Sequence, residues 1–341
     1  MDLRVDSDHF LQKIQESLET VLEKIASNPA DHPSLRAGLR FSKDLIDTVR
    51  NLCLAKDAKR IRPRLVHLFG QTLNIQDQQL VPIATAAELI HSASLLHDDV
   101  VDEGTVRRGY PTANALHGNQ RAVLVGDLLF SQAFFQLKSL PKGILDHAID
   151  VIDVMSRAAA MEVDVRGNLD LALDDWCVIA EGKTGALFGW CGEAVGILAN
   201  DPEAALRFLS CGKRFGIIFQ MADDVKDFQL MNQVASKDPL ADLRTQTPSF
   251  PILMAVLESS PFKTKLQQAW SGGIAANSLE KNWSALGHEL LKTSALEKTI
   301  QRMSEDIAYT SEVMSPYRNT PGGRDISFWI HHLWQSLQFS A

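Results

Sequence analysis

Apolar residues recur at steps of three and four along most of the chain, which is the period of an amphipathic helix. The first such stretch, 10–25, carries Phe10, Ile14, Leu18 and Leu22 on one face. The same period predicts helices over 78–103, 121–140, 144–166, 175–199, 203–232, 250–258 and 294–315. Alternation with a period of two is scarce, and no Asn-Gly or Asp-Gly pair occurs, so little sheet is expected. The pattern predicts an all-α protein.

Connections are expected where Gly, Pro and polar residues gather, at 26–35, 104–119, 200–203, 233–249 and 271–278. No linker rich in Ser and Gly divides the chain, and no short repeat is present. We therefore expect one all-α domain over 1–341.

Composition narrows the class of protein. Hydrophobic residues make up 45% of the 341 positions and charged residues 22%, which excludes a largely disordered chain. The formal net charge of −8 argues against broad binding to nucleic acids or anionic membranes. We recognise no apolar run of membrane-spanning length and no secretory leader. The four cysteines form no Cys-x-x-Cys pair, so no zinc site or disulfide framework is expected, and the reducing cytoplasm is the predicted location.

One motif, DDxxD, occurs twice, at Asp98–Asp102 and at Asp223–Asp227. On a helix its first and last aspartates are four residues apart and share a face, where they repel each other. A bound cation would offset that repulsion, and carboxylate oxygens are ligands that suit Mg²⁺. A single motif of this kind is as often an acidic helix end that faces solvent as it is a metal site. Two of them, each ending an apolar helix, predict two walls of a metal-lined cleft.

Basic residues accompany the aspartates in the sequence. They are Lys59, Arg60 and Arg62, then Arg107 and Arg108, then Lys183, and finally Lys237. Singly, each is a typical surface charge. Together with two metal motifs they favour a diphosphate, which metal ions hold on one side and charged donors on the other. No serine-nucleophile, zinc-protease, Walker or dinucleotide-binding motif is present.

These stretches together resemble one known family, the trans-isoprenyl diphosphate synthases, also called polyprenyl synthetases. The matching segments, in chain order from 59 to 243, are KRIRP, HSASLLHDDVVDEGTVRRGYPT, GD, EGKTGALF, FQMADDVKD and KDPLADL. The resemblance covers residues 40–255, which form the motif-bearing core of the domain, whereas residues 316–341 are an atypical C-terminal part. It implies an isoprenoid synthase-type bundle of antiparallel helices around a central cavity, usually in a homodimer.

The resemblance also implies a reaction. An allylic diphosphate, held by about three Mg²⁺ ions, ionises to a carbocation, which the double bond of isopentenyl diphosphate attacks head-to-tail. Loss of a proton leaves an all-trans polyprenyl diphosphate five carbons longer and free diphosphate, and the metal ions stabilise the leaving charge. The expected partners are the two substrates, a second copy of the chain and, transiently, a membrane that receives the product. Nucleic acid is not expected.

The resemblance assigns roles residue by residue. The implied metal ligands are Asp98, Asp99, Asp102, Asp223, Asp224 and Asp227. Lys183, Lys237 and Arg107 correspond to contacts with the allylic diphosphate, and Lys59, Arg62, His91 and Arg108 to the isopentenyl diphosphate pocket. Thr184 and Gln220 match positions beside the reacting carbons. His97 is expected to pack between helices.

Several positions depart from the family pattern. Ala58 and Ser236 stand where the family has Gly, and Asp164-Val165 stands where it has Gly-Glu or Gly-Gln. Thr245-Gln246-Thr247 replaces a stretch that contains a lysine, and TPGGR at 320–324 is atypical. These changes bear on substrate affinity and loop closure, whereas both sets of metal ligands are complete.

Side chains before the first motif bear on product length. A residue four positions before Asp98 lies about one turn, roughly 5.4 Å, deeper in the expected cavity. Ala93 and Ser94 are both small, so the cavity is expected to stay open and the product to be long, C30 to C50, with C20 as the alternative. Phe134 and Phe135 are candidates for a deeper floor, and ordinary core packing explains them equally well.

Other functions remain open at this point. A non-catalytic or partner-dependent subunit of a heteromeric synthase is favoured by the missing lysine near 247, although both aspartate motifs are complete. A class I terpene cyclase normally carries a different second metal motif. An HD-type metal phosphohydrolase, suggested by His91 and His97-Asp98, leaves the second motif unused. A purely structural helical protein explains neither the paired acids nor the cations.

Overall fold

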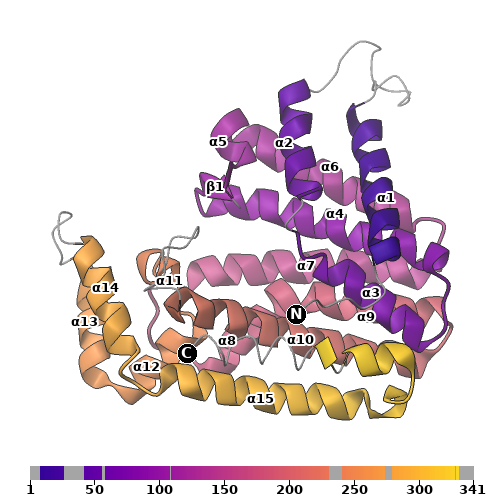
Figure 1. Cartoon of the computed structure of the whole chain (residues 1–341). Helices are drawn as coiled ribbons and strands as arrows, with labels where there is room; N and C mark the ends of the chain where they lie inside the picture. Colours follow the sequence, from indigo (N-terminus) through magenta and orange to yellow (C-terminus); the bar gives the residue numbers. More distant parts are fainter. Residues whose placement is uncertain are drawn as a thin grey trace. The chain divides into compact units, whose positions relative to one another are not determined.

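The computed structural model describes residues 8–26, 42–55, 58–107, 109–229, 240–272, 279–326 and 328–329. Helices account for nearly all of this part of the chain (Figure 1). The α-helices are α1 (Asp8–Ala26), α2 (Lys43–Cys53), α3 (Ile61–Thr72), α4 (Asp77–Val101), α5 (Ala113–His117), α6 (Asn119–Leu137), α7 (Lys142–Asp164), α8 (Leu173–Ala180), α9 (Ala186–Leu198), α10 (Pro202–Gln229), α11 (Ala241–Arg244), α12 (Phe250–Glu258), α13 (Ser260–Trp270), α14 (Leu279–Leu290) and α15 (Ala295–Val313). The all-α prediction is confirmed.

Two short departures from α-helix matter for the site. A π-helical segment, η2 (Glu181–Gly185), separates α8 from α9, so the helix predicted over 175–199 is three segments. Strands β1 (Val106–Arg107) and β2 (Tyr110–Pro111) pair antiparallel inside the predicted loop 104–119. A 3-10 turn, η5 (Ser315–Tyr317), follows α15.

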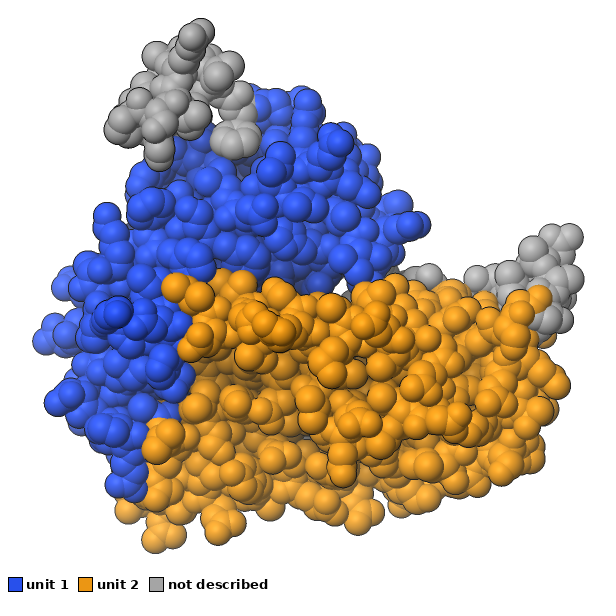
Figure 2. Space-filling model, turned by 180° about the vertical axis from the view of Figure 1, so that it is seen from behind, with its two compact units in different colours: residues 1–148, 191–205, 320–325 blue, residues 149–190, 206–319, 326–341 orange. Residues whose placement is uncertain are grey.

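The chain divides into two compact units, coloured separately in Figure 2. The first unit comprises residues 1–148, 191–205 and 320–325, and the second comprises 149–190, 206–319 and 326–341. The first aspartate motif belongs to the first unit and the second motif to the second. The expectation of a single domain stays a prediction.

Helix α4 is the centre of the first unit, where it packs against α1, α2, α3, α5 and, most extensively, α6. Its alanines allow close helix packing, and Ala84, Ala86 and Ala87 are completely buried. By length and composition α4 could cross a membrane, so the expectation that no run reaches that length was wrong. Because 67% of its most apolar stretch is buried inside the protein, it is the core helix of this unit.

The second unit has an apolar core between the end of α10 and the helices that follow it. Phe228, Leu243, Ile252, Leu266 and Leu290 are fully buried in this cluster. Around it, α12 packs against α13 and α15 (Figure 1). This core fixes the C-terminal half of α10, which carries the second aspartate motif.

Candidate active site

The first aspartate motif forms the last turn of α4. Asp102, the residue that caps the helix, is exposed, and Asp98, one turn earlier, is half-buried. Asp99 lies about 100° further round the helix, and it is only 5% exposed. The outer aspartates therefore share the accessible face expected of metal ligands, and the middle one points into the protein.

Asp99 is engaged by the segment that follows the motif. Its Oδ1 accepts hydrogen bonds from Nη2 and Nε of Arg107 on β1, at 2.7 and 2.9 Å. The Asn114 amide donates to the carbonyls of Asp99 and Gly104, at 3.1 and 3.0 Å. These contacts tie the β1–β2 hairpin and α5 to the end of α4. Asp99 thus supports the shape of the loop, and the guanidinium of Arg107 is held beside the motif.

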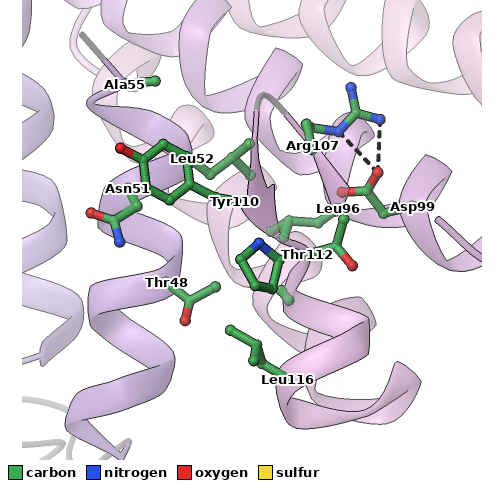
Figure 3. A pocket seen from close by; sticks show the side chains of 12 residues that line it. Thr48, Asn51, Leu52, Ala55, Leu96, Asp99, Arg107, Tyr110, Thr112 and Leu116 are labelled. Carbon is green, nitrogen blue, oxygen red and sulfur yellow. Dashed lines mark hydrogen bonds and ion pairs between the residues drawn. The ribbon is translucent and has the colours of Figure 1, made fainter. Parts of the chain in front are cut away.

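A pocket lies next to this ion pair in the first unit (Figure 3). Its wall residues come from α2, α4, α5 and the hairpin, and they include Leu52, Leu96, Tyr110 and Leu116. Its polar wall residues are Asp99 and Arg107, which form the ion pair, and Thr48, Asn51 and Thr112.

The basic segment KRIRP forms a tight turn into α3. Arg60 is the residue before the helix and has a left-handed backbone, φ 49°. Its guanidinium donates to Glu88 Oε2 at 2.6 Å and also to the Cys53 carbonyl. Lys59 is exposed, whereas Arg62 is partly buried in the first turn of α3. Burial lowers the pKa of Arg62, and the Glu88 carboxylate opposes that change.

Other expected residues of the first unit lie on α4 and α6. His91 is half-buried, Ala93 is fully buried and Ser94 is half-buried. The His97 ring packs edge-on against Phe130 of α6, and its Nε2 lies 3.1 Å from the Val123 carbonyl. His97 therefore packs between helices, as expected.

In the second motif, as in the first, the aspartates differ in their exposure and in the groups that they bind. Asp223 is exposed, and no hydrogen bond or ion pair to it is found within the described part of the chain. Asp224 is 6% exposed and accepts hydrogen bonds from the Phe250 backbone N–H and the Gln220 amide, both at 3.1 Å. Asp227 accepts the backbone N–H groups of Ala241 and Asp242, both at 3.3 Å. Asp224 and Asp227 thereby hold the starts of α12 and α11, and Asp223 faces solvent.

The π-helical segment brings Lys183 and Thr184 to this motif. Lys183 forms an ion pair with Glu162 of α7. The Thr184 hydroxyl donates to Gln220 Oε1 at 3.2 Å, and Gln220 continues the chain of hydrogen bonds to Asp224. Single π-turns inside helices occur frequently at functional sites. Thr184, Gln220 and Asp224 are thus joined by hydrogen bonds within the second unit, and Lys183 lies next to Thr184 in the π-helical segment.

Glycines on α10 make this meeting possible. A methyl group on Gly212 would lie 2.3 Å from the Phe188 carbonyl oxygen, and one on Gly216 would lie 2.4 Å from Gly185 Cα. The glycine face that precedes Gln220 therefore receives the π-helical segment and the start of α9.

Two carboxylates at this site were not predicted, Asp242 and Glu162. Burial raises the pKa of Asp242 to about 7, with further contributions from Asp227, Glu162 and Asp223. Burial also raises the pKa of Asp224, and Asp242 adds to the rise. Asp242 lies in the matched segment KDPLADL, which was the available signal. Glu162 lies two residues before the departure at Asp164, and only its contact with Lys183 reveals it.

These carboxylates suit a divalent cation. The donors are all hard oxygen ligands, and their mutual repulsion is what a cation would offset. Within the described residues, no three His, Cys, Asp or Glu side chains by themselves form a group that could hold a metal ion. The aspartates of the two motifs belong to different units, so the donors of each motif are considered separately.

The unusual stretch Thr245-Gln246-Thr247 is firmly anchored. The Gln246 carbonyl accepts the Gly167 N–H at 2.8 Å, and its side-chain amide donates to the Trp270 carbonyl at 3.1 Å. The two threonine hydroxyls lie 2.8 Å apart. Where the family has a lysine, this chain thus has a turn fastened to the core of the second unit.

Three expectations concern residues outside the described part of the chain: Lys237, Ser236 and Arg108. Phe135, one of the two candidates for a deeper floor, is 49% exposed, and the ammonium groups of Lys24 and Lys138 lie 5.2 and 5.5 Å from its ring centroid. Its exposure fits neither a cavity floor nor ordinary core packing.

Comparison with known proteins identifies the family of this chain. A family model described as "Polyprenyl synthetase" matches residues 43–282. The chain belongs to the polyprenyl synthetase family. Family members are prenyltransferases that depend on divalent metal ions and use isopentenyl and allylic diphosphates, so this polyprenyl synthetase is an enzyme of that class.

Individual relatives cover most of this polyprenyl synthetase. Octaprenyl diphosphate synthase of Haemophilus influenzae is 33% identical over 250 residues, 72% of this chain and 74% of the relative. Octaprenyl diphosphate synthase of Escherichia coli K12 is 29% identical over 309 residues, which cover 89% of this chain and 94% of the relative. A solved polyprenyl synthase of Caulobacter crescentus CB15, complexed with calcium and isoprenyl diphosphate, superposes with a TM-score of 0.84 at 20% identity, covering 97% of this chain and 96% of that one. At 20% identity, the likeness to the Caulobacter protein shows a shared fold alone.

Proposed function

We propose that this polyprenyl synthetase condenses isopentenyl diphosphate with an allylic diphosphate, head-to-tail, to an all-trans polyprenyl diphosphate of C30 to C50. The observation that carries the proposal is the matching construction of the two aspartate motifs. In each, the middle aspartate is buried against protein donors, and an outer aspartate is exposed at the end of an apolar helix. A purely structural helix end would not require this arrangement twice.

Asp98, Asp102 and Asp223 would hold Mg²⁺, about three ions in all. Bound Mg²⁺ would supply the positive charge that stabilises the departing diphosphate. Lys183, Arg107 and Lys237 would orient the allylic diphosphate by charge-assisted hydrogen bonds. Thr184 and Gln220 are joined by a hydrogen bond of 3.2 Å, and they would present polar oxygens beside the reacting carbons. Asp99, Asp224 and Asp227 would act by fixing the segments that they bind.

Lys59, Arg62, His91 and Arg108 would bind isopentenyl diphosphate. The described members of this set come from the turn before α3 and from the face of α4 that leads to the first motif. Separate cationic sites for two diphosphates distinguish a synthase from a terpene cyclase, which has one diphosphate to bind.

The long product follows from the side chains below the first motif. Ala93 is fully buried and Ser94 half-buried, and neither is large enough to close a cavity one turn below Asp98. The relatives named octaprenyl diphosphate synthases support this length. C20 is the alternative that a deeper floor would give.

We further propose a cytoplasmic homodimer that contacts membranes when the product leaves. All four cysteines are unbridged, as a reducing compartment requires. On α6, the exposed apolar side chains of Val123 and Leu124 offer a surface for a second copy. Light scattering of the purified protein, with a dimer mass expected, tests the assembly.

The decisive experiment is mass spectrometry of the products that the purified chain forms from Mg²⁺, isopentenyl diphosphate and farnesyl diphosphate. A ladder ending at C30 to C50 is expected, and a chelator should abolish it. A stop at C20 would contradict the proposed length. The second candidate, a partner-dependent subunit, is favoured by the anchored Thr245-Gln246-Thr247 turn. It predicts no elongation with any C5 to C20 starter until another subunit is added.

A further inference from the structure

Glu88 is a buried carboxylate on α4 that the roles described above do not use. It is only 5% exposed, although a charged side chain is rarely buried without a partner. It lies three residues before His91, so it begins the helical face that continues through Leu95 and Asp98 to Asp102. Glu88 therefore stands at the opposite end of this face from the first aspartate motif.

The partner of Glu88 is Arg60. Nη1 of Arg60 lies 2.6 Å from Glu88 Oε2, and the two side chains are 13% and 6% exposed. The second guanidinium nitrogen donates to the carbonyl of Cys53, the last residue of α2. The Arg60 side chain is thus fixed at two points, one on α4 and one on α2.

This anchoring matters because the backbone at Arg60 is unfavourable. Its φ of 49° is in the left-handed region, which costs energy for a residue with a side chain. No side chain caps the start of α3 at this position. The ion pair with Glu88 offsets this cost and keeps the backbone of Arg60 in the left-handed conformation.

The conformation of the turn decides where its neighbours point. Lys59 precedes Arg60 and is exposed, and Arg62 occupies the first turn of α3, where the Glu88 carboxylate acts on its guanidinium. His91 is one helical turn from Glu88 on the same face. One carboxylate thus acts on the turn that carries Lys59 and Arg62, two of the residues assigned above to isopentenyl diphosphate.

We propose that Glu88 is a positioning residue of the isopentenyl diphosphate pocket, acting through Arg60 on the turn that carries Lys59 and Arg62. This inference rests on the proposed function. It predicts a selective effect, because none of the groups that Glu88 organises belongs to the allylic site.

The test compares steady-state kinetics of Glu88→Gln with those of the wild type, each substrate varied at saturation of the other. The KM for isopentenyl diphosphate should rise about tenfold, while kcat and the KM for the allylic diphosphate stay within about twofold. The matched control is Asp306→Asn in the second unit. Asp306 is also 5% exposed and is bound by Arg214 at 3.1 Å, so its loss should lower stability and leave both KM values unchanged.

A second variant keeps the charge. Arg60→Lys cannot reach both Glu88 and the Cys53 carbonyl, and it should show the same selective rise, whereas Arg214→Lys should not. Arg60→Lys also tests the inference if Glu88→Gln does not fold. Equal rises in both KM values, or a fall in kcat alone, would overturn the inference while the wild type remains active. An inactive wild type would overturn the proposed function, and the inference would fall with it.

Discussion

Gly216 on α10 approaches Gly185 of the π-helical segment so closely that a methyl group on Gly216 would lie 2.4 Å from the Cα of Gly185. One turn further along α10, Gln220 accepts the Thr184 hydroxyl. The backbone approach at Gly216 and the hydrogen bond at Gln220 are thus consecutive contacts of the same two segments. The glycine sets the distance at which Thr184 and Lys183 face the second motif.

Gly216→Ala should therefore damage both stability and activity. The added methyl meets backbone atoms, which cannot rotate away, and overpacking of this kind costs about 1–3 kcal/mol. The displaced π-helical segment should also lose the Thr184–Gln220 hydrogen bond, so turnover should fall. Urea unfolding and steady-state kinetics measure the two effects.

Gly143→Ala is the matched control. A methyl there would meet only the Ile197 methyl groups, at 3.9 Å, an ordinary contact distance. Since Ala is the better helix former, this variant should be as stable as the wild type or more so. A Gly216→Ala protein that behaves like Gly143→Ala would show that the close approach is not required.

The GD pair of the sequence has a similar explanation in the first unit. A methyl group on Gly126 would lie 2.3 Å from Nε2 of His97, and Asp127 Oδ1 lies 3.5 Å from the same nitrogen. Gly126→Ala should displace the ring and destabilise the protein by about 1–3 kcal/mol. Because His97→Ala removes the ring, the double variant should lose less stability than the two single variants added together. Additive losses in thermal unfolding would contradict this contact.

The spacing of apolar residues was sufficient to predict the long helices, although α4 is buried on all sides at residues 83–90. It predicted α4 as 78–103, against the observed Asp77–Val101. It did not predict the shorter helices α2, α3, α13 and α14. In α2 the buried Leu45, Val49 and Cys53 do recur at helical steps, but over only eleven residues. The π-turn could not be predicted from EGKTG, because its close contact is with Gly216 on another helix.

Within the site, residue types predicted the outer aspartates, but tertiary contacts decided the other roles. Asp99 and Asp102 are the same residue type in one motif, and only helix orientation buries the first and exposes the second. Glu162 was missed because nothing in its own neighbourhood points to Lys183, 21 residues later. The β1–β2 hairpin was missed because strands of two residues have no measurable period.

In the first motif, substitution of the buried Asp99 should therefore lower stability, whereas substitution of the exposed Asp102 should lower activity. Asp99→Asn weakens the ion pair with Arg107 and should lower the free energy of unfolding by about 1–3 kcal/mol. Asp102→Asn is at an exposed position and should change it by less than about 0.5 kcal/mol, while Mg²⁺-dependent turnover falls about a hundredfold or more. Unfolding curves and product assays on both variants check the contrast, which equal stability losses would refute.

The second motif should show the same contrast. Asp224→Ala leaves the Phe250 N–H and the Gln220 amide without their acceptor, at a cost of about 1–3 kcal/mol. Asp223→Ala removes an exposed carboxylate and should leave stability unchanged while turnover is lost. Guanidinium titration followed by circular dichroism measures the first effect and radiolabelled elongation the second. Full activity of Asp223→Ala would remove it from the set of metal ligands.

Product length should respond to Ser94, whose side chain lies half-buried one turn below Asp98. Its hydroxyl donates to the His91 carbonyl at 2.8 Å, so the hydrogen bond that substitution removes lies within α4. Ser94→Phe adds a ring at the level where the growing chain would pass, and the product distribution should shift to shorter chains. The control is Ser311→Phe, at an exposed serine on α15 with the same kind of bond, to the Ile307 carbonyl at 3.0 Å. Mass spectrometry should show shortening for Ser94→Phe alone, and an unchanged distribution would place the path of the chain elsewhere.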